Sequence, residues 1–157
     1  MQKKPIKALP LVSINNKRTC GECTACCDGW LTANIKGEDM YPGKPCQFSI
    51  FGKGCSDYKN RPEDPCVTFK CEWLAHPEAY PDQLRPDRSK AIFVMRNIKD
   101  IEYLSIAEAG QNLQADILTF GIKTALSNGF NFSWQVNGTT HWYGSTEFSE
   151  AMKEANG

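Results

Sequence analysis

The residues of this chain best suited to chemistry are its cysteines, and they are concentrated in one stretch. A Cys-x2-Cys step lets two sulfurs reach one ion while the backbone amides between them donate to the thiolates. The first four cysteines form two such steps in a row, and Gly21 eases the tight turn that the first step needs. We therefore predict that the thiolates bind metal. The eight predicted ligands are Cys20, Cys23, Cys26, Cys27, Cys46, Cys55, Cys66 and Cys71.

The number of thiols allows two arrangements of metal. Eight soft ligands would satisfy two tetrahedral sites, or one cluster with thiols to spare. Side chains of adjacent residues usually point apart, so we expect Cys26 and Cys27 to serve different sites, or only one of them to be a ligand. His76 follows Cys71 by five residues and is an alternative nitrogen ligand in its place.

The softness, spacing and number of the ligands together favour zinc as the cofactor, with iron or a [4Fe–4S] cluster as the alternative. Structural zinc sites commonly combine two separated Cys-x2-Cys pairs, whereas the last pair here, Cys66-x4-Cys71, is wider. Three cysteines in a Cys-x2-Cys-x2-Cys run are typical of bacterial ferredoxins, which bind iron–sulfur clusters. The downstream spacings do not match a ferredoxin.

The compartment decides whether the thiols stay reduced. No segment is long and apolar enough to span a bilayer. The segment Ile6–Ile14 follows lysines but is interrupted by Pro10 and lacks a cleavage pattern, so we expect an extended lead-in rather than a secretory signal. We therefore expect a cytoplasmic protein, in which thiols persist and disulfides do not. Four disulfides in a secreted protein are the alternative.

The charge of the chain argues against nucleic-acid and membrane partners. Its 18 basic and 18 acidic residues balance, so no chain-wide attraction to phosphate or acidic lipid is expected. The start of the chain is the exception, and we expect a solvated terminus there, with a basic arm for nucleic acid as the alternative. Its basic residues are Lys3, Lys4, Lys7, Lys17 and Arg18.

The chain that must position the cysteines divides into four segments. Residues 1–19 form the basic lead-in, and residues 20–75 form the cysteine-rich metal-binding region. The latter has few long apolar runs, so metal ligation would have to supply much of its ordering free energy. Residues 76–90 contain three prolines and are predicted to be an extended connector. Residues 91–157 form a conventional α+β unit.

The pattern of this last unit predicts two helices and a small antiparallel sheet with a hairpin. Alternation from Phe130 to Val136 ends at Asn137-Gly138, a dipeptide typical of two-residue hairpin turns. This turn would pair Val136 with Thr139, Trp134 with His141, and Phe132 with Tyr143. The other predicted strands are Ala91–Ile98 and Ile101–Ala107, and the helices are Leu113–Ser127 and Glu147–Ala155. The predicted fold class is thus α+β, with an irregular cysteine-rich metal-binding lobe packed on this sheet.

The cysteine-rich region of the sequence resembles a known family. The run CGECTACC, followed by CQF, GCSDYKNRP and PC, is similar to the zinc- or iron-chelating domain family of CxxCxxCC (YkgJ-like) proteins. The resemblance covers about residues 20–75 and implies an eight-cysteine metal site in a bacterial or phage cytoplasmic protein with no settled biochemical role. A related motif in flagellin lysine methylases makes a catalytic metal conceivable by analogy.

The resemblance assigns the cysteines motif by motif. The first motif matches Cys20, Cys23, Cys26 and Cys27, and the middle pair matches Cys46 and Cys55. Cys66 matches the cysteine that follows the Tyr58–Pro62 segment. The chain departs from the commonest spacing by one extra residue between Pro62 and Cys66, a departure that bears on Cys66 and Cys71 as the last two ligands.

Three classes of function follow from these observations. The leading hypothesis is a metal-binding protein with a structural site. The first alternative is a redox or transferase enzyme with an iron–sulfur cluster or an open zinc position. The second is a nucleic-acid or protein interaction module, supported only by the basic lead-in. The sequence selects no catalytic residue, substrate or protein partner.

Overall fold

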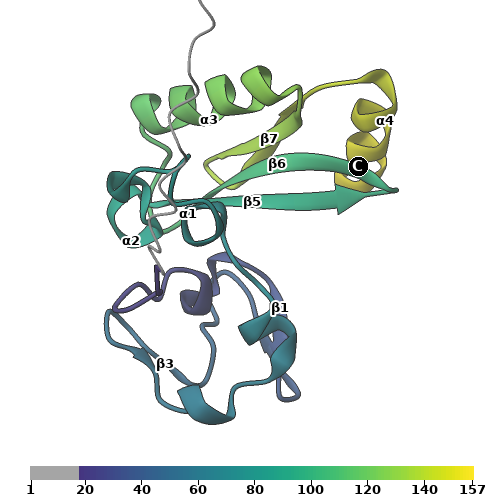
Figure 1. The fold of residues 1–157 in the computed structure, drawn as a ribbon. Coiled ribbons are helices and arrows are strands. Elements are labelled where there is room, and N and C mark those ends of the chain that lie inside the picture. The colour runs from purple at the N-terminus through teal and green to yellow at the C-terminus, as the bar shows by residue number, and fades with distance from the viewer. Residues whose placement is uncertain (1–17) are drawn as a thin grey trace, which may run out of the picture.

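A four-stranded sheet organises the chain, and helices cover it (Figure 1). The computed structural model describes residues 18–157 as a mixed α/β fold with small sheets and several helices. The strands of the large sheet lie in the order β5-β6-β7-β8. Their bounds are Ala91–Ile98 for β5, Ile101–Glu108 for β6, Asn131–Val136 for β7 and Thr139–Tyr143 for β8.

The sheet is mixed, which corrects the prediction of a purely antiparallel sheet. The pairs β5–β6 and β7–β8 are antiparallel, but β6 and β7 run parallel, with Leu104 opposite Phe132. Helix α3 (Ala115–Asn128) joins the two parallel strands and carries the chain back along the sheet. A crossover of this kind is what parallel neighbours require.

Helix α3 packs closely on one face of the sheet through a glycine. A Cβ atom added at Gly121 would clash with the side chain of Ile106 and lie 3.0 Å from Phe93. Phe120 of the same helix forms edge-to-face contacts with Phe93 and Tyr80, with ring centroids 6.0 and 5.6 Å apart. The missing side chain therefore lets the helix backbone approach the sheet, and the three aromatic rings fill the space beside it.

The hairpin of β7 and β8 confirms the sequence prediction. Val136 pairs with Thr139, Trp134 with His141, and Phe132 with Tyr143. Asn137 and Gly138 have φ angles of 50° and 75°, as this type of turn requires. The remaining predicted elements also form, with bounds that differ by no more than two residues. Ser145 caps the last helix, α4 (Thr146–Asn156), because its hydroxyl accepts a hydrogen bond from the N–H of Phe148 at 3.1 Å.

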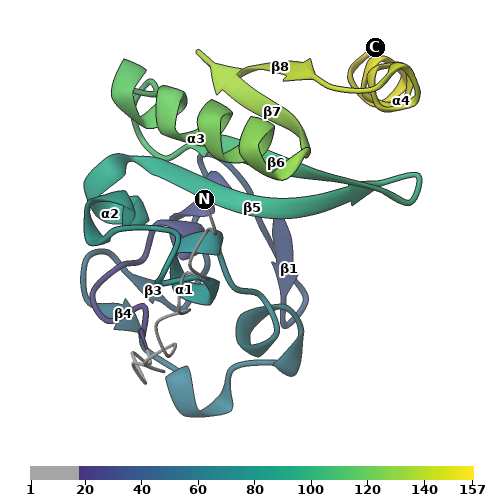
Figure 2. The ribbon, with the colours of Figure 1, turned by 45° about the horizontal axis from the view of Figure 1, so that its top comes forward.

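The cysteine-containing region lies on the opposite side of the sheet from α3 (Figures 1 and 2). It contains two small antiparallel hairpins, β1–β2 and β3–β4, and several short helical turns. The strands are β1 (Ala33–Ile35), β2 (Glu38–Met40), β3 (Ser49–Ile50) and β4 (Gly54–Cys55). The helical turns are η1 (Cys26–Trp30), η2 (Tyr58–Asn60), η3 (Glu63–Val67) and α1 (Glu72–Ala75).

One hydrophobic core joins the cysteine-containing region to the sheet. Its buried members include Ala25, Cys71 and Trp73 from the first half, and Ile92 and Phe93 from strand β5. The segment between the two halves, residues 76–90, is not fully extended, because it forms two short helical turns, η4 (Asp82–Leu84) and α2 (Pro86–Ser89). The cysteine-containing region thus packs its apolar side chains against those of the sheet.

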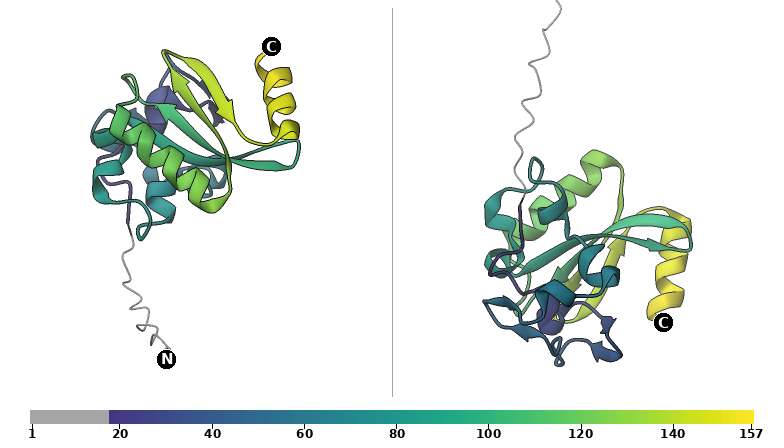
Figure 3. Two further views of the ribbon diagram at one scale, coloured as in Figure 1. Left: turned by 90° about the horizontal axis from the view of Figure 1, so that it is seen from above. Right: turned by 60° about the horizontal axis from the view of Figure 1, so that its bottom comes forward.

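The first described residue is fixed on this core. The Arg18 guanidinium donates to the carbonyl oxygens of Trp73 and Tyr80, both at 2.7 Å, and lies 4.5 Å from the centre of the Trp73 ring. The other basic residues of the predicted lead-in, and the segment Ile6–Ile14, lie outside the described residues (Figure 3). No helix within residues 18–157 has the length and apolar character of a membrane span.

Candidate metal centre

All eight cysteines carry free thiols, so the alternative of four disulfides is wrong for this structure. Cys46 and Cys71 are buried, Cys20 and Cys27 are exposed, and the other four are partly buried. The thiols come from η1, the loop before it, β4, η3 and the loops that precede β3 and α1. Contacts and backbone hydrogen bonds divide them into two sets of four.

The first set consists of Cys20, Cys23, Cys26 and Cys71. Buried Cys71 belongs to the main core, and Cys23 and Cys26 pack against the same core. The N–H of Cys23 donates to the carbonyl oxygen of Cys20 at 2.8 Å, which closes the tight turn of the first Cys-x2-Cys step. Cys71 therefore joins the N-terminal run although it lies far away in the sequence.

The second set consists of Cys27, Cys46, Cys55 and Cys66. Buried Cys46 belongs to a separate small core, against which Cys66 packs. The N–H of Cys46 donates to the carbonyl oxygen of Cys27 at 2.8 Å. Cys55 pairs with Ser49 across the β3–β4 hairpin, and the N–H of Ser49 donates to the carbonyl oxygen of Cys46 at 2.9 Å. The adjacent residues Cys26 and Cys27 thus fall into different sets.

The electrostatics of the thiols agree with this division. Burial raises the pKa of Cys26 well above its usual value, and Cys71 is the thiol that adds most to the increase. The Cys27 thiol is exposed at its surface, but desolvation by its neighbours still raises its pKa, and among the thiols Cys46 adds most. The two sets also influence one another, since Cys27 raises the pKa of Cys26 and Cys20 raises that of Cys27. The two sets therefore adjoin at one peptide bond.

Groups that favour the thiolate form lie beside both sets. Burial raises the pKa of Cys71 to about 11, but the backbone N–H groups of Leu74 and Trp73 act against that increase. Burial likewise raises the pKa of Cys20 and Cys66, and the Arg61 guanidinium opposes it at both thiols. Amide donors and nearby cations are the surroundings that a thiolate ligand of a metal needs.

The donor atoms do not form a finished coordination site. Within residues 18–157, no group of three or more His, Cys, Asp or Glu side chains has the arrangement that holds a metal ion. The predicted thiols therefore lie in two neighbourhoods, but their side chains do not have the arrangement that a bound ion requires. The type of donor, four free thiols in each neighbourhood, fits a tetrahedral thiolate-binding metal.

The alternative ligand His76 has other neighbours. Its Nε2 atom lies 3.6 Å from the carboxylate of Glu72, and its Nδ1 atom lies 3.4 Å from that of Glu78. Its side chain is 51% exposed, whereas Cys71 is buried in the main core. The structure therefore places Cys71, and not His76, in the core against which Cys23 and Cys26 pack.

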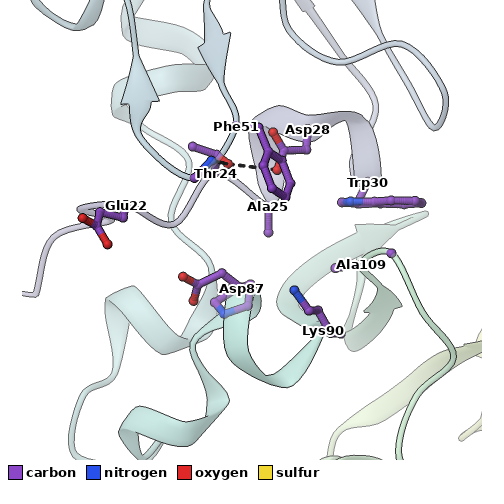
Figure 4. Close-up of a pocket in the computed structure, with 12 residues that line it drawn as sticks. Glu22, Thr24, Ala25, Asp28, Trp30, Phe51, Asp87, Lys90 and Ala109 are labelled. Carbon is purple, nitrogen blue, oxygen red and sulfur yellow. Dashed lines mark hydrogen bonds between the residues drawn. The ribbon is translucent and has the colours of Figure 1, made fainter.

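A cavity of about 410 Å³ adjoins the first set and was not foreseen from the sequence (Figure 4). It lies between the segment from Glu22 to Trp30, the tip of the β3–β4 hairpin, α2 and the end of β6. A smaller cavity of about 250 Å³ shares three of its lining residues, Asp28, Trp30 and Phe51. The signal in the sequence was Phe51, an aromatic residue between Gly52 and a two-residue strand.

Comparison of the chain with protein-family models, curated proteins and solved structures finds no match.

Proposed function

We propose that this chain is a zinc-binding protein that holds two metal ions in closed, structural thiolate sites. Cys20, Cys23, Cys26 and Cys71 would bind one ion, and Cys27, Cys46, Cys55 and Cys66 the other. The observation that carries the proposal is the grouping of the free thiols: Cys23, Cys26 and Cys71 pack in the main core, and Cys46 and Cys66 pack in the small one. Backbone hydrogen bonds join Cys20 to Cys23 and Cys27 to Cys46, and Cys55 pairs with Ser49 across the β3–β4 hairpin. Four thiolates are the ligand set of a closed tetrahedral zinc site.

Zinc bound in this way would stabilise a region that has little core of its own. The second set surrounds a cluster with only three buried members, Ile35, Met40 and Cys46. Metal–thiolate bonds would cross-link η1, β4, η3 and the loops between them. Binding of a structural zinc ion contributes on the order of 10 kcal/mol to folding. This contribution would offset the conformational entropy lost by so many loops.

The proposal extends to the family and the compartment. A two-ion site of eight thiolates fits the resemblance to the CxxCxxCC family, and we assign the chain to that kind of protein as part of the proposal. Thiols that remain free and reduced imply a reducing compartment, which for this chain would be the cytoplasm.

Metal analysis of the full chain, purified without oxygen and without chelators, tests the proposal. We expect about two zinc ions per chain and no absorption near ~400 nm, where thiolate-bound iron–sulfur clusters absorb. Replacement of zinc by cobalt should give the visible bands of tetrahedral thiolate coordination. Iron with matching sulfide would contradict the zinc assignment and favour a cluster enzyme. Protein that is purified in this way and contains no metal would contradict metal binding altogether.

A further inference from the structure

We propose that Asp28, Trp30 and Phe51 form a binding site for a small organic cation, with an alkylated ammonium group as the ligand class. These three residues line both cavities described above, which therefore meet at one place. The site uses none of the eight thiols, so the proposal goes beyond metal binding. It rests on the aromatic surfaces, the charge and the hydrogen bonds of the two cavities.

The aromatic walls supply the first part of the argument. Phe51 is 80% exposed, the highest exposure among the large apolar side chains of residues 18–157. It stands at the tip of the β3–β4 hairpin, whose turn is closed by a hydrogen bond of 2.9 Å from Lys53 N–H to the carbonyl oxygen of Ile50. Trp30 is partly buried and packs against the main core. The face of an aromatic ring carries partial negative charge and attracts cations.

A hydrogen-bonded network fixes the Asp28 carboxylate of this cavity. The hydroxyl of Thr24 donates to Asp28 Oδ2 at 2.9 Å, and the hydroxyl of Ser49 donates to Asp28 Oδ1 at 3.1 Å. The N–H of Gly52 donates to the hydroxyl of buried Thr24 at 3.1 Å. The same network therefore holds the Asp28 carboxylate and the loop that carries Phe51, so the site is preorganised.

The charge of the larger cavity favours a cation. Three carboxylates, those of Glu22, Asp28 and Asp87, face one ammonium group, that of Lys90. Asp87 is neutralised by Arg85, with two contacts of 2.6 Å. Within residues 18–157, Glu22, Asp28 and Lys90 make no ion pair. Two unneutralised carboxylates thus oppose one lysine.

The position of the lysine leaves room for the ligand. In Figure 4, Asp28, Trp30 and Phe51 lie on one side of the cavity, and Asp87 and Lys90 lie on the other. A volume of about 410 Å³ is within the range of small-molecule sites. The cavity therefore has room for an ammonium group with its alkyl substituents on the side that carries both rings and Asp28, opposite Lys90.

Calorimetric titration of the full chain with choline tests this proposal, and the neutral isostere of choline, in which carbon replaces the quaternary nitrogen, is the matched ligand. We expect choline to bind and the isostere to bind at least about tenfold more weakly, because only the cation interacts with ring faces and carboxylate. The indole N–H resonance of Trp30, assigned with Trp30→Phe, should shift with choline. Equal binding of the two ligands, or binding of neither, would overturn the proposal.

Variants locate the site. Phe51→Leu keeps an apolar side chain but removes the ring, and Asp28→Asn removes the charge but keeps the shape; each should weaken choline binding about tenfold. Tyr143→Ala removes an aromatic side chain that is 62% exposed outside both cavities and should leave binding unchanged. Phe51→Leu changes an exposed residue, so it remains informative if Asp28→Asn fails to fold. Unchanged binding in Phe51→Leu would overturn the proposal.

A lysine variant separates a cation site from an anion site. Lys90→Gln should leave choline binding unchanged or make it stronger, because it removes the competing positive charge. Saturable binding of inorganic phosphate that Lys90→Gln abolishes, without binding of choline, would overturn the proposal and assign the cavity to anions.

Discussion

The N–H of Cys46 donates a 2.8 Å hydrogen bond to the carbonyl oxygen of Cys27. This bond ties a buried thiol of the second set to a residue whose preceding neighbour, Cys26, packs against the main core with the first set. The two thiol sets therefore meet at one peptide bond in η1. Two zinc sites at this point would be structurally coupled but would share no ligand.

Two adjacent substitutions should remove different metal ions. Cys26→Ser should lose the ion of the first set and Cys27→Ser that of the second, so each variant should retain about one of two zinc ions. Metal content and the cobalt spectrum of each variant measure this. The double variant Cys26→Ser/Cys27→Ser should lose both. Loss of both ions in either single variant would indicate one shared cluster instead.

The metal-free chain should lose stability in alkaline solution. The folded state buries Cys71 and raises its pKa to about 11, above the ordinary value of 9.0. The unfolded chain therefore gives up this proton first, so the stabilisation is complete below pH 9 and is lost as pH rises through about 11.

Urea unfolding of chelator-treated, reduced protein between pH 8 and pH 12 measures this loss. The zinc-loaded chain is the control, because its thiolates are already deprotonated by the metal and should show a weaker dependence. Its stability should instead fall in acid, as protons compete for the thiolates. A metal-free chain whose stability increased above pH 9 would contradict the burial of the Cys71 thiol.

Gly29 should tolerate no side chain. Its φ angle is 92°, and an added Cβ would clash with the carbonyl oxygen of Tyr41 and lie 3.0 Å from that of Lys44. Gly29→Ala should therefore lower the free energy of unfolding by about 3 kcal/mol, through backbone strain and overpacking. Gly37 has a similar φ of 88° and nothing near its Cβ, so Gly37→Ala should cost about 1 kcal/mol. Equal losses in the two variants, measured by urea unfolding, would contradict the close packing at Gly29.

Glu108 should stabilise the hairpin that it does not belong to. Its carboxylate accepts the N–H groups of Asn137 and Gly138 at 2.9 and 3.0 Å. Glu108→Ala should cost about 1 kcal/mol because both turn amides lose a charged acceptor. Glu102→Ala, on the same strand, is the matched control and should have little effect on the melting temperature. A larger loss of stability in Glu102→Ala than in Glu108→Ala would show that the turn does not depend on the Glu108 carboxylate.

The sequence predicted elements that depend on local chemistry. Asn137-Gly138 and the alternation before it specified the β7–β8 hairpin with its register, because a two-residue turn fixes which residues face one another. The parallel pairing of β6 with β7 could not be predicted in this way. It comes with the close packing of α3 on the sheet, where Gly121 lies against Ile106, and these two residues have no local signal in common.

The candidate site was predictable in part for the same reason. The Cys-x2-Cys-x2-Cys-Cys run indicated the ligand type, and adjacency indicated that Cys26 and Cys27 separate. The assignment of Cys55, Cys66 and Cys71 to one set or the other depends on the paths of irregular loops. The cavity beside Phe51 was missed because a single exposed aromatic residue has no distinctive spacing.

The core that spans both halves of the chain limits how the protein can be rearranged. Trp73 and Cys71 share buried contacts with Ile92 and Phe93 across the segment 76–90. A cut in that segment would leave an uncovered apolar face on each fragment, and such faces favour aggregation. Neither fragment should therefore fold as an exchangeable module. A chimaera that grafts residues 20–75 onto another scaffold would have to supply a sheet face of matching shape.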